Sequence, residues 1–443
     1  MRNSFVMIGV SLVVFGMSCL AAPRAVAQDQ QDQSKAPTYT MPEYNAFQAC
    51  RAETNAQARA KCLDDFVTKF PNSTLMLYVN QLYFATYNEL KNYPKTIEYA
   101  DKLVALGDKI DSGTAVQTLY LRSLAFNASF NDKAPDAVDQ LNKERAAALM
   151  AIDILSKIAK PANVPDDQFA AQKKMLTVFF NYMAGFTSSD PNVKDYASAI
   201  KYFKAGLAAD PNDTVTNYKL GLAYLLSTPP QSLDGFWALA RAIDLKVTDA
   251  PKIQDYLRKQ ILAYEQPGCD NLADAQLNEL LQLAANAPDR PATYTIPSVD
   301  DLDKIRKASN IITVLTDLKA GSDKAKMTWL AICGLEFPEV VGKVIDVAPG
   351  TDSVELHLAT GATPEEIQAA TAANLDVKVV GQPEASRVQK DDGVRFSGTL
   401  VSYDPDPAFM LHWDKAKVNP EDIPAEKTGK HAPHKVAPKN PGN

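Results

Sequence analysis

The side chains that could take part in catalysis are few and lie late in the chain. All four histidines lie at or after His357, so the long preceding part has no imidazole to act as a general base or a metal ligand. Paired carboxylates such as Asp300 and Asp301 are neighbours in sequence, whereas the two acids of a glycosidase must face each other across a cleft. Helix caps and turns therefore explain such pairs better than a catalytic site does.

Familiar catalytic spacings are missing as well. The sequence has no GxSxG, no HExxH and no glycine-rich phosphate loop. His357 and His412 alternate with apolar neighbours, as on the polar face of a half-buried strand. We predict a protein that is not an enzyme, with no catalytic residue, no cofactor and no metal site. The enzymatic alternative needs a carboxylate pair that this spacing does not reveal.

Composition narrows the class of partner. The 443 residues are 46% hydrophobic and 22% charged, which suits a globular chain of two or three domains. A formal net charge of -7 disfavours nucleic acid, because phosphate binding needs clustered Lys and Arg. The exception is the last stretch, residues 421–443, which we predict to be a basic disordered tail. Contact with an anionic envelope surface or histidine-mediated metal binding are the alternatives for it. After Glu426 it carries Lys427, Lys430, His431, His434, Lys435 and Lys439 and no acidic side chain.

The first residues have the features of an export signal. Arg2 precedes an apolar run over residues 5–17, and Ala25-Val26-Ala27 is a small-x-small cleavage site. We predict a signal peptide over residues 1–27 and a flexible segment over residues 28–40. The mature protein is then periplasmic or secreted, with no transmembrane segment, because no comparably long apolar run follows. Lipid attachment at Cys19 is a weaker alternative, and the signal style suggests a bacterial envelope.

Four cysteines remain after the predicted cleavage, and they allow three pairings. Cys50 and Cys62 are the nearest pair along the chain and lie on the two arms of a predicted helical hairpin, so they are the candidate disulfide in an oxidising compartment. Four buried free thiols are the other reading, and the sequence leaves both open. No CxxC spacing supports a redox or zinc site.

Residues 41–286 have helical periodicity and predict about five antiparallel helix pairs. The pattern is clearest in one stretch, where apolar residues recur three and four apart, a proline ends the helix, and the small Ala199 and Gly221 allow two helices to approach closely. That stretch contains Tyr196, Ala199, Ile200, Phe203, Leu207, Pro211, Leu220, Gly221 and Tyr224.

After a proline-rich linker at residues 287–297 the pattern changes. We predict a helical connector over residues 298–336, with helices at 302–318 and 322–330. A period of two then indicates a small β domain over residues 337–420 that resembles an oligonucleotide- or oligosaccharide-binding (OB) barrel, with a sandwich as the alternative. The predicted strands cover residues 341–347, 353–358, 375–380, 394–402 and 409–416, with a short helix between the second and third that starts at residues 364–366 and continues over 367–373. The predicted fold class is thus mainly α, an α-solenoid followed by an OB-like β-barrel.

The stretch from Tyr196 to Tyr224 resembles a tetratricopeptide repeat, and residues 44–71 and 78–107 are similar to it. The resemblance implies that a protein or peptide docks in a concave groove lined by the first helix of each pair. For Leu222 and Leu225, packing between repeats is the competing role. The implied groove residues are Tyr78, Gln81 and Asn88 on one helix and Tyr218, Leu222 and Leu225 on a later one.

These observations predict an exported, non-enzymatic interaction scaffold that binds a protein or peptide partner in the bacterial envelope. The alternative is a β domain that binds an envelope glycan, with Tyr403, Phe409 and Trp413 as stacking residues. The sequence gives neither the identity of the partner nor the oligomeric state.

Overall fold

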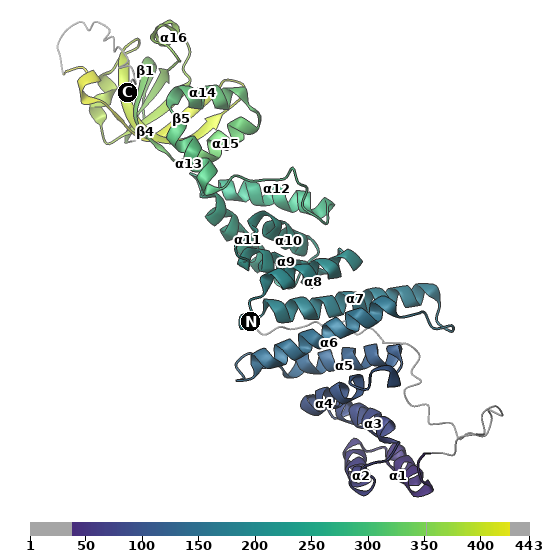
Figure 1. Ribbon diagram of the computed structural model, residues 1–443. Coiled ribbons are helices and arrows are strands. Elements are labelled where there is room, and N and C mark those ends of the chain that lie inside the picture. Colours follow the sequence, from purple (N-terminus) through teal and green to yellow (C-terminus); the bar gives the residue numbers. More distant parts are fainter. Residues whose placement is uncertain (1–37, 351, 426–443) are drawn as a thin grey trace. The chain divides into compact units, whose positions relative to one another are not determined.

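The computed structural model describes residues 38–350 and 352–425 (Figure 1). These residues form two compact units, one ending at Val247 and the other beginning at Thr248. The first unit is helical, and the second combines helices with a closed five-stranded barrel. The predicted fold class is therefore confirmed as mainly helical with a small OB-like barrel near the C-terminal end. The predicted signal peptide (1–27), residues 28–37 and the tail from residue 426 lie outside the described residues.

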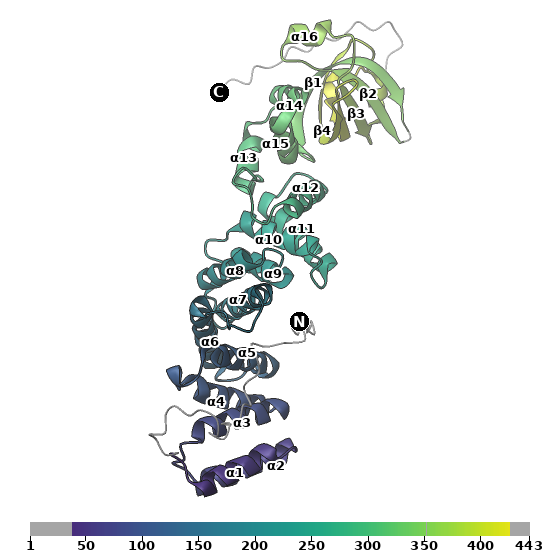
Figure 2. The same ribbon diagram turned by 90° about the vertical axis from the view of Figure 1, so that its right-hand side faces the viewer.

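In the first unit, helices follow one another in antiparallel pairs, and each packs against the next along the chain. Further contacts join α5 to α7 and α7 to α9, so the first helices of neighbouring pairs also touch. Figure 2 shows this succession of stacked helices. The helices are α1 (Met41–Ala52), α2 (Ala56–Lys69), α3 (Met76–Glu89), α4 (Tyr93–Val104), α5 (Ser112–Ser129), α6 (Ala137–Lys157), α7 (Asp166–Ser189), α8 (Tyr196–Ala209), α9 (Thr214–Leu226) and α10 (Ser232–Asp244).

Local sequence fixes where these helices begin and how closely they approach. Asp195 and Asp213 cap α8 and α9, each accepting a hydrogen bond from a backbone amide of the first turn. Ala199 is fully buried, and a Cβ placed on Gly221 would lie 2.7 Å from the Cγ of Leu239 in α10. The close approach predicted at Gly221 is thus present, because the backbone of α9 at this residue lies against the Leu239 side chain of α10.

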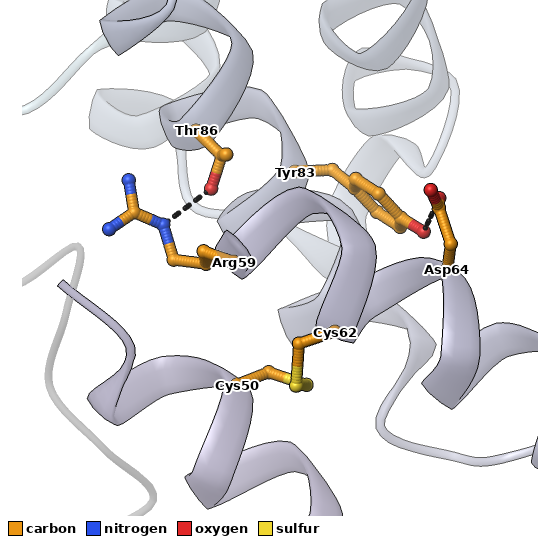
Figure 3. Close-up of a disulfide and its surroundings, with 6 residues drawn as sticks. All are labelled: Cys50, Arg59, Cys62, Asp64, Tyr83 and Thr86. Carbon is orange, nitrogen blue, oxygen red and sulfur yellow. Dashed lines mark hydrogen bonds between the residues drawn. A yellow bond between two sulfur atoms is a disulfide. The ribbon is translucent and has the colours of Figure 1, made fainter. Parts of the chain in front are cut away.

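A disulfide joins α1 to α2 at Cys50 and Cys62, the pair that the sequence favoured (Figure 3). Two polar contacts then tie α2 to α3. The Arg59 Nε donates to the Thr86 hydroxyl at 2.7 Å, and the Tyr83 hydroxyl donates to the Asp64 carboxylate at 2.6 Å. The first three helices are therefore held by a covalent bond and by hydrogen bonds as well as by their apolar cluster.

The second unit begins with five helices: α11 (Ala250–Glu265), α12 (Leu272–Asn286), α13 (Val299–Ala308), α14 (Ile311–Ala320) and α15 (Ser322–Ile332). A disulfide between Cys269 and Cys333 links the α11–α12 connection to the end of α15. A Cβ on Gly268 would lie 1.8 Å from the carbonyl oxygen of Cys333, so only glycine fits this backbone crossing. The sequence prediction placed α11 and α12 in the helical array. The disulfide instead joins the connection between them to the helices that follow residues 287–297.

One predicted helix is wrong in its extent. We expected a single helix over residues 302–318, but the chain breaks into α13 and α14 at Ser309 and Asn310. The Asn310 side chain accepts hydrogen bonds from the amides of Ile312 and Thr313, and Asn310 itself is extended. An Asn that caps the following turn competes with helix continuation, which is the physical reason for the break.

The barrel strands close in the order β1-β2-β3-β5-β4, with β4 paired back to β1. All neighbours are antiparallel except β3 and β5. Closure excludes the sandwich alternative, and the helix predicted between the second and third strands is present as α16. The elements are β1 (Glu336–Pro349), β2 (Ser353–Ala359), α16 (Pro364–Ala369), β3 (Leu375–Val380), β4 (Gly393–Asp404), β5 (Met410–Val418) and the short 3-10 turn η3 (Pro420–Asp422).

The barrel does not have a core of its own. Leu302, Leu315 and Ile332 from helices α13–α15 belong to the same buried cluster as Phe337, Phe396 and the other inward-facing strand residues. Figure 2 shows α14 and α15 beside the barrel. The segment 298–336, expected as a connector, is in structural terms part of the β domain.

Candidate functional site

The groove residues predicted on α3 differ in how much surface they offer. Tyr78 is half-buried, and its ring centroid lies 6.4 Å from that of Phe47 in α1. Gln81 is half-buried and Asn88 is exposed. Tyr78 thus divides its surface between the α1–α3 cluster and solvent, while Asn88 is free to meet another molecule.

The residues predicted on α9 form a more continuous surface. Tyr218 and Leu222 are half-buried, and Val215 and Leu226, which the sequence did not single out, are 39% and 53% exposed. Positions 215, 218, 222 and 226 are spaced three and four apart, so they share one helix face. Leu225 belongs elsewhere, because it packs against Gly235 of α10. We call Val215, Tyr218, Lys219, Leu222 and Leu226 the α9 face.

Lys219 places a cation within this apolar face. Its Nζ lies 5.7 Å from the ring centroid of Phe186 in α7 and 5.9 Å from that of Tyr218. Burial lowers the pKa of Lys219, and the charge of Asp190 opposes that effect only in part. No carboxylate in the described residues lies within ion-pair distance of it. The α9 face therefore combines apolar side chains with a poorly neutralised amine. In the sequence, the signal for this face is a charge in the middle of an apolar stripe, and our prediction did not include it.

The two predicted groups of residues do not form one site. They lie on α3 and α9, with the helices from α4 to α8 between them along the array (Figure 1). A single long partner would have to follow the array to touch both. The α9 face is the one with the larger exposed apolar surface.

A second arrangement, on the outside of the barrel, was not predicted. Strand register aligns Asp346 of β1 with His357 of β2, then Asp376 of β3 and His412 of β5. The row ends at Asp404 of β4, whose carboxylate lies 2.8 Å from the Nε2 of His412. Carboxylates and imidazoles thus alternate across all five strands. We call these five residues the Asp–His row.

His412 is held at both ring nitrogens. Its Nδ1 lies 3.1 Å from Asp376, and its Nε2 contacts Asp404. Because a neutral imidazole has only one N–H, both contacts are satisfied at once only by the protonated ring. Burial alone would lower the pKa of His412, but the hydrogen bonds to Asp404 and Asp376 outweigh it and raise the pKa above its usual value. An imidazole occupied at both nitrogens has no lone pair left to act as a general base.

The glycan-stacking residues are brought together only in part. Trp413 is 2% exposed and packs edge-on against Phe337 and Phe396 inside the barrel, so its predicted stacking role is wrong. The cause is the strand alternation that turns His412 outward and Trp413 inward. Tyr403 and Phe409 are half-buried. The ring centroid of Tyr403 lies 5.0 Å from that of Trp329 in α15. Stacking on a glycan stays a prediction for Tyr403 and Phe409 alone.

Within residues 38–350 and 352–425, no group of three or more His, Cys, Asp or Glu side chains is arranged to hold a metal ion. No helix in these ranges has both the length and the apolar character needed to cross a membrane. No protein-family model matches the chain, and no curated protein matches it significantly.

Proposed function

We propose that the protein is a non-enzymatic interaction scaffold whose helical unit binds a protein or peptide partner through the α9 face. The observation that carries this proposal is the apolar stripe on α9, in which Val215 and Leu226 are exposed and Leu222 between them is half-buried. Large contiguous apolar patches on a protein surface, especially those bordered by polar residues, mark interaction sites. The tetratricopeptide-like pattern of the neighbouring helices supports the same reading.

The chemistry of the α9 face defines the partner. An extended or helical segment with apolar anchors would cover the stripe. A carboxylate on that segment would pair with Lys219, whose Nζ lies near two aromatic rings and has no carboxylate within ion-pair distance among the described residues. A buried ion pair between Lys219 and the partner would favour partners that carry this carboxylate. A partner without it would leave the Lys219 amine desolvated and unpaired.

The bacterial envelope is the compartment we propose. The signal-like first residues motivate it, and the two disulfides fit it because such bonds persist in oxidising compartments. The cytosol would keep these four thiols reduced.

The test is affinity capture from envelope extracts, followed by a binding titration with the captured partner. Tyr218→Glu combined with Leu226→Glu should lower the amount captured at least tenfold, because charges would replace the apolar contact. Ala208→Glu, at an exposed position of α8, is the matched control and should capture as much as the wild type. Equal capture by the double variant, with its helical circular dichroism intact, would refute the proposal.

A further inference from the structure

Glu265, the last residue of α11, is a fully buried carboxylate. Neither of its side-chain oxygens accepts a hydrogen bond from any of the described residues. Glu144 of α6 is equally buried, but Arg122 pairs with it. A buried polar group without a partner is rare in proteins, and an ionised one is strongly disfavoured. The structure therefore favours the protonated form of Glu265.

The residues that follow Glu265 hold the end of α11 to two other helices. The backbone N–H of Gly268 donates to the carbonyl of Leu330 in α15 at 2.9 Å, and Arg306 of α13 donates to the carbonyl of Gln266. We call these contacts of residues 265–269 with α13 and α15 the α11 junction. A charge that appears on Glu265 acts directly on this junction, because the buried side chain cannot reach water while the junction is closed.

The α11 junction has one lysine for two carboxylates. Lys326 of α15 is the cation that acts on Glu265, but its Nζ already pairs with Glu279 of α12 at 2.5 Å. Burial raises the pKa of Glu265 to about 7, and the charge of Lys326 opposes that rise only in part. The charged and titratable groups around the junction are Lys326 on α15, Glu279 on α12, Asp301 and Arg306 on α13, Arg290 and Tyr294 between α12 and α13, and Tyr264 on α11 itself.

We propose that Glu265 is a pH-controlled latch, whose protonated form keeps the α11 junction closed and whose ionisation opens it. Opening lets water reach the carboxylate, which then loses its proton near its ordinary pKa of about 4.5. The closed form is thus favoured most below about pH 4.5, and this advantage is lost as pH rises to about 7. The disulfide between Cys269 and Cys333 stays intact, so the opening is local.

The experiment is hydrogen exchange of the full, oxidised chain at pH 5 and pH 7.5. Each rate is divided by the exchange rate of an unstructured amide at the same pH, which gives the opening equilibrium. While only the open form is ionised, this equilibrium rises tenfold per pH unit. We expect at least a tenfold increase for amides at the end of α11 and in α15. Glu265→Gln, which cannot ionise, should remove this increase.

The matched control is Glu336→Gln, at an exposed position of β1 in the same unit, which should keep the increase. A second measurement needs no variant of Glu265 for its outcome: the side-chain carboxyl carbon of Glu265 should titrate near pH 7 in the wild type. Lys326→Met should move that midpoint to higher pH, because it removes the cation that opposes the rise. A midpoint near 4.5, an increase that Glu265→Gln retains, or an increase spread evenly over both compact units would each overturn the proposal.

Discussion

Arg122 on α5 is a buried cation held between two carboxylates. It is 3% exposed and pairs with Glu144 of α6, which is fully buried, and with Asp101 of α4, which is half-exposed. Burial raises the pKa of Glu144 to about 7, and the charge of Arg122 opposes that rise. Buried pairs of this kind add little net stability, but removing one partner leaves the other charge without compensation.

Arg122→Met should therefore destabilise the first unit by about 3 kcal/mol at pH 8. The cost should be smaller at pH 5, because Glu144 is then protonated and carries no unpaired charge. In the wild type, the pKa of Glu144 is higher in the folded state than in the unfolded state. Its contribution to the free energy of unfolding therefore falls as pH rises from about 4.5 to about 7. Hydrogen exchange of α5 and α6 in urea at the two pH values measures the difference. Arg122→Met with Glu144→Gln should recover most of the loss, and an equal cost at both pH values would contradict the argument.

His412 gives a titration with the same sign as Glu144, because its pKa is also raised in the folded state. Its pKa is raised in the folded barrel, so the stabilisation is complete below about pH 6.5, the unfolded value, and is lost as pH rises through the folded pKa. The proton resonances of the ring should titrate with a midpoint above 6.5. Asp404→Asn should lower this midpoint because it removes the carboxylate at Nε2. A midpoint that Asp404→Asn leaves unchanged would show that the contact is not made in solution.

The packing of α9 on α10 depends on the absence of a side chain at one position. A methyl group at Gly221 would lie within 3.0 Å of three Leu239 atoms, one of them the backbone nitrogen, so the helices must separate. We expect Gly221→Ala to destabilise the first unit by about 1–3 kcal/mol, the usual cost of overpacking. Thermal unfolding checks this. Ala205→Ser, at an exposed position of α8, should leave the midpoint unchanged, and a Gly221→Ala protein as stable as the wild type would disprove the close contact.

Periodicity alone predicted most of the helices and all five strands, because apolar side chains three and four apart or in alternation report directly on burial. It failed where a local hydrogen bond competes, as at Asn310, whose cap divides one expected helix into two. The burial of Trp413 followed from the same alternation that placed His412 outside, and the stacking prediction ignored it.

The Asp–His row could not have been read from the sequence, because its members come from five separate strands and meet only through strand register. The α9 face was predicted only in part. Tyr218 and Leu222 were singled out because the sequence around them resembles a tetratricopeptide repeat. Val215 and Leu226 needed knowledge of which side of α9 its neighbours leave uncovered, whereas Lys219 stands in the sequence as a charge within the apolar stripe. The pairing of Cys269 with Cys333, 64 residues apart, likewise depends on the fold.

The two disulfides should stabilise different compact units. Loop-closure entropy gives about 3 kcal/mol for the 12-residue separation of Cys50 and Cys62 and about 4 kcal/mol for the 64-residue separation of Cys269 and Cys333. Replacing Cys269 and Cys333 by Ser should speed hydrogen exchange in α12 and α15 and leave α1–α3 unchanged. Replacing Cys50 and Cys62 should do the reverse, so each double variant is the control for the other. Faster exchange in both units from either replacement would contradict their independence.

The core that α13–α15 share with the strands has a practical consequence for anyone who dissects this molecule. A fragment that begins at Phe337 would lose Leu302, Leu315 and Ile332 from the buried cluster that they share with the strand residues, and part of that cluster would become exposed. Exposed apolar surface of this kind promotes aggregation. Non-specific binding of sugars or peptides to it would be mistaken for specific recognition. Expression clones for the β domain should start upstream of Ser298, and ideally at Thr248, so that helices α13–α15 are retained.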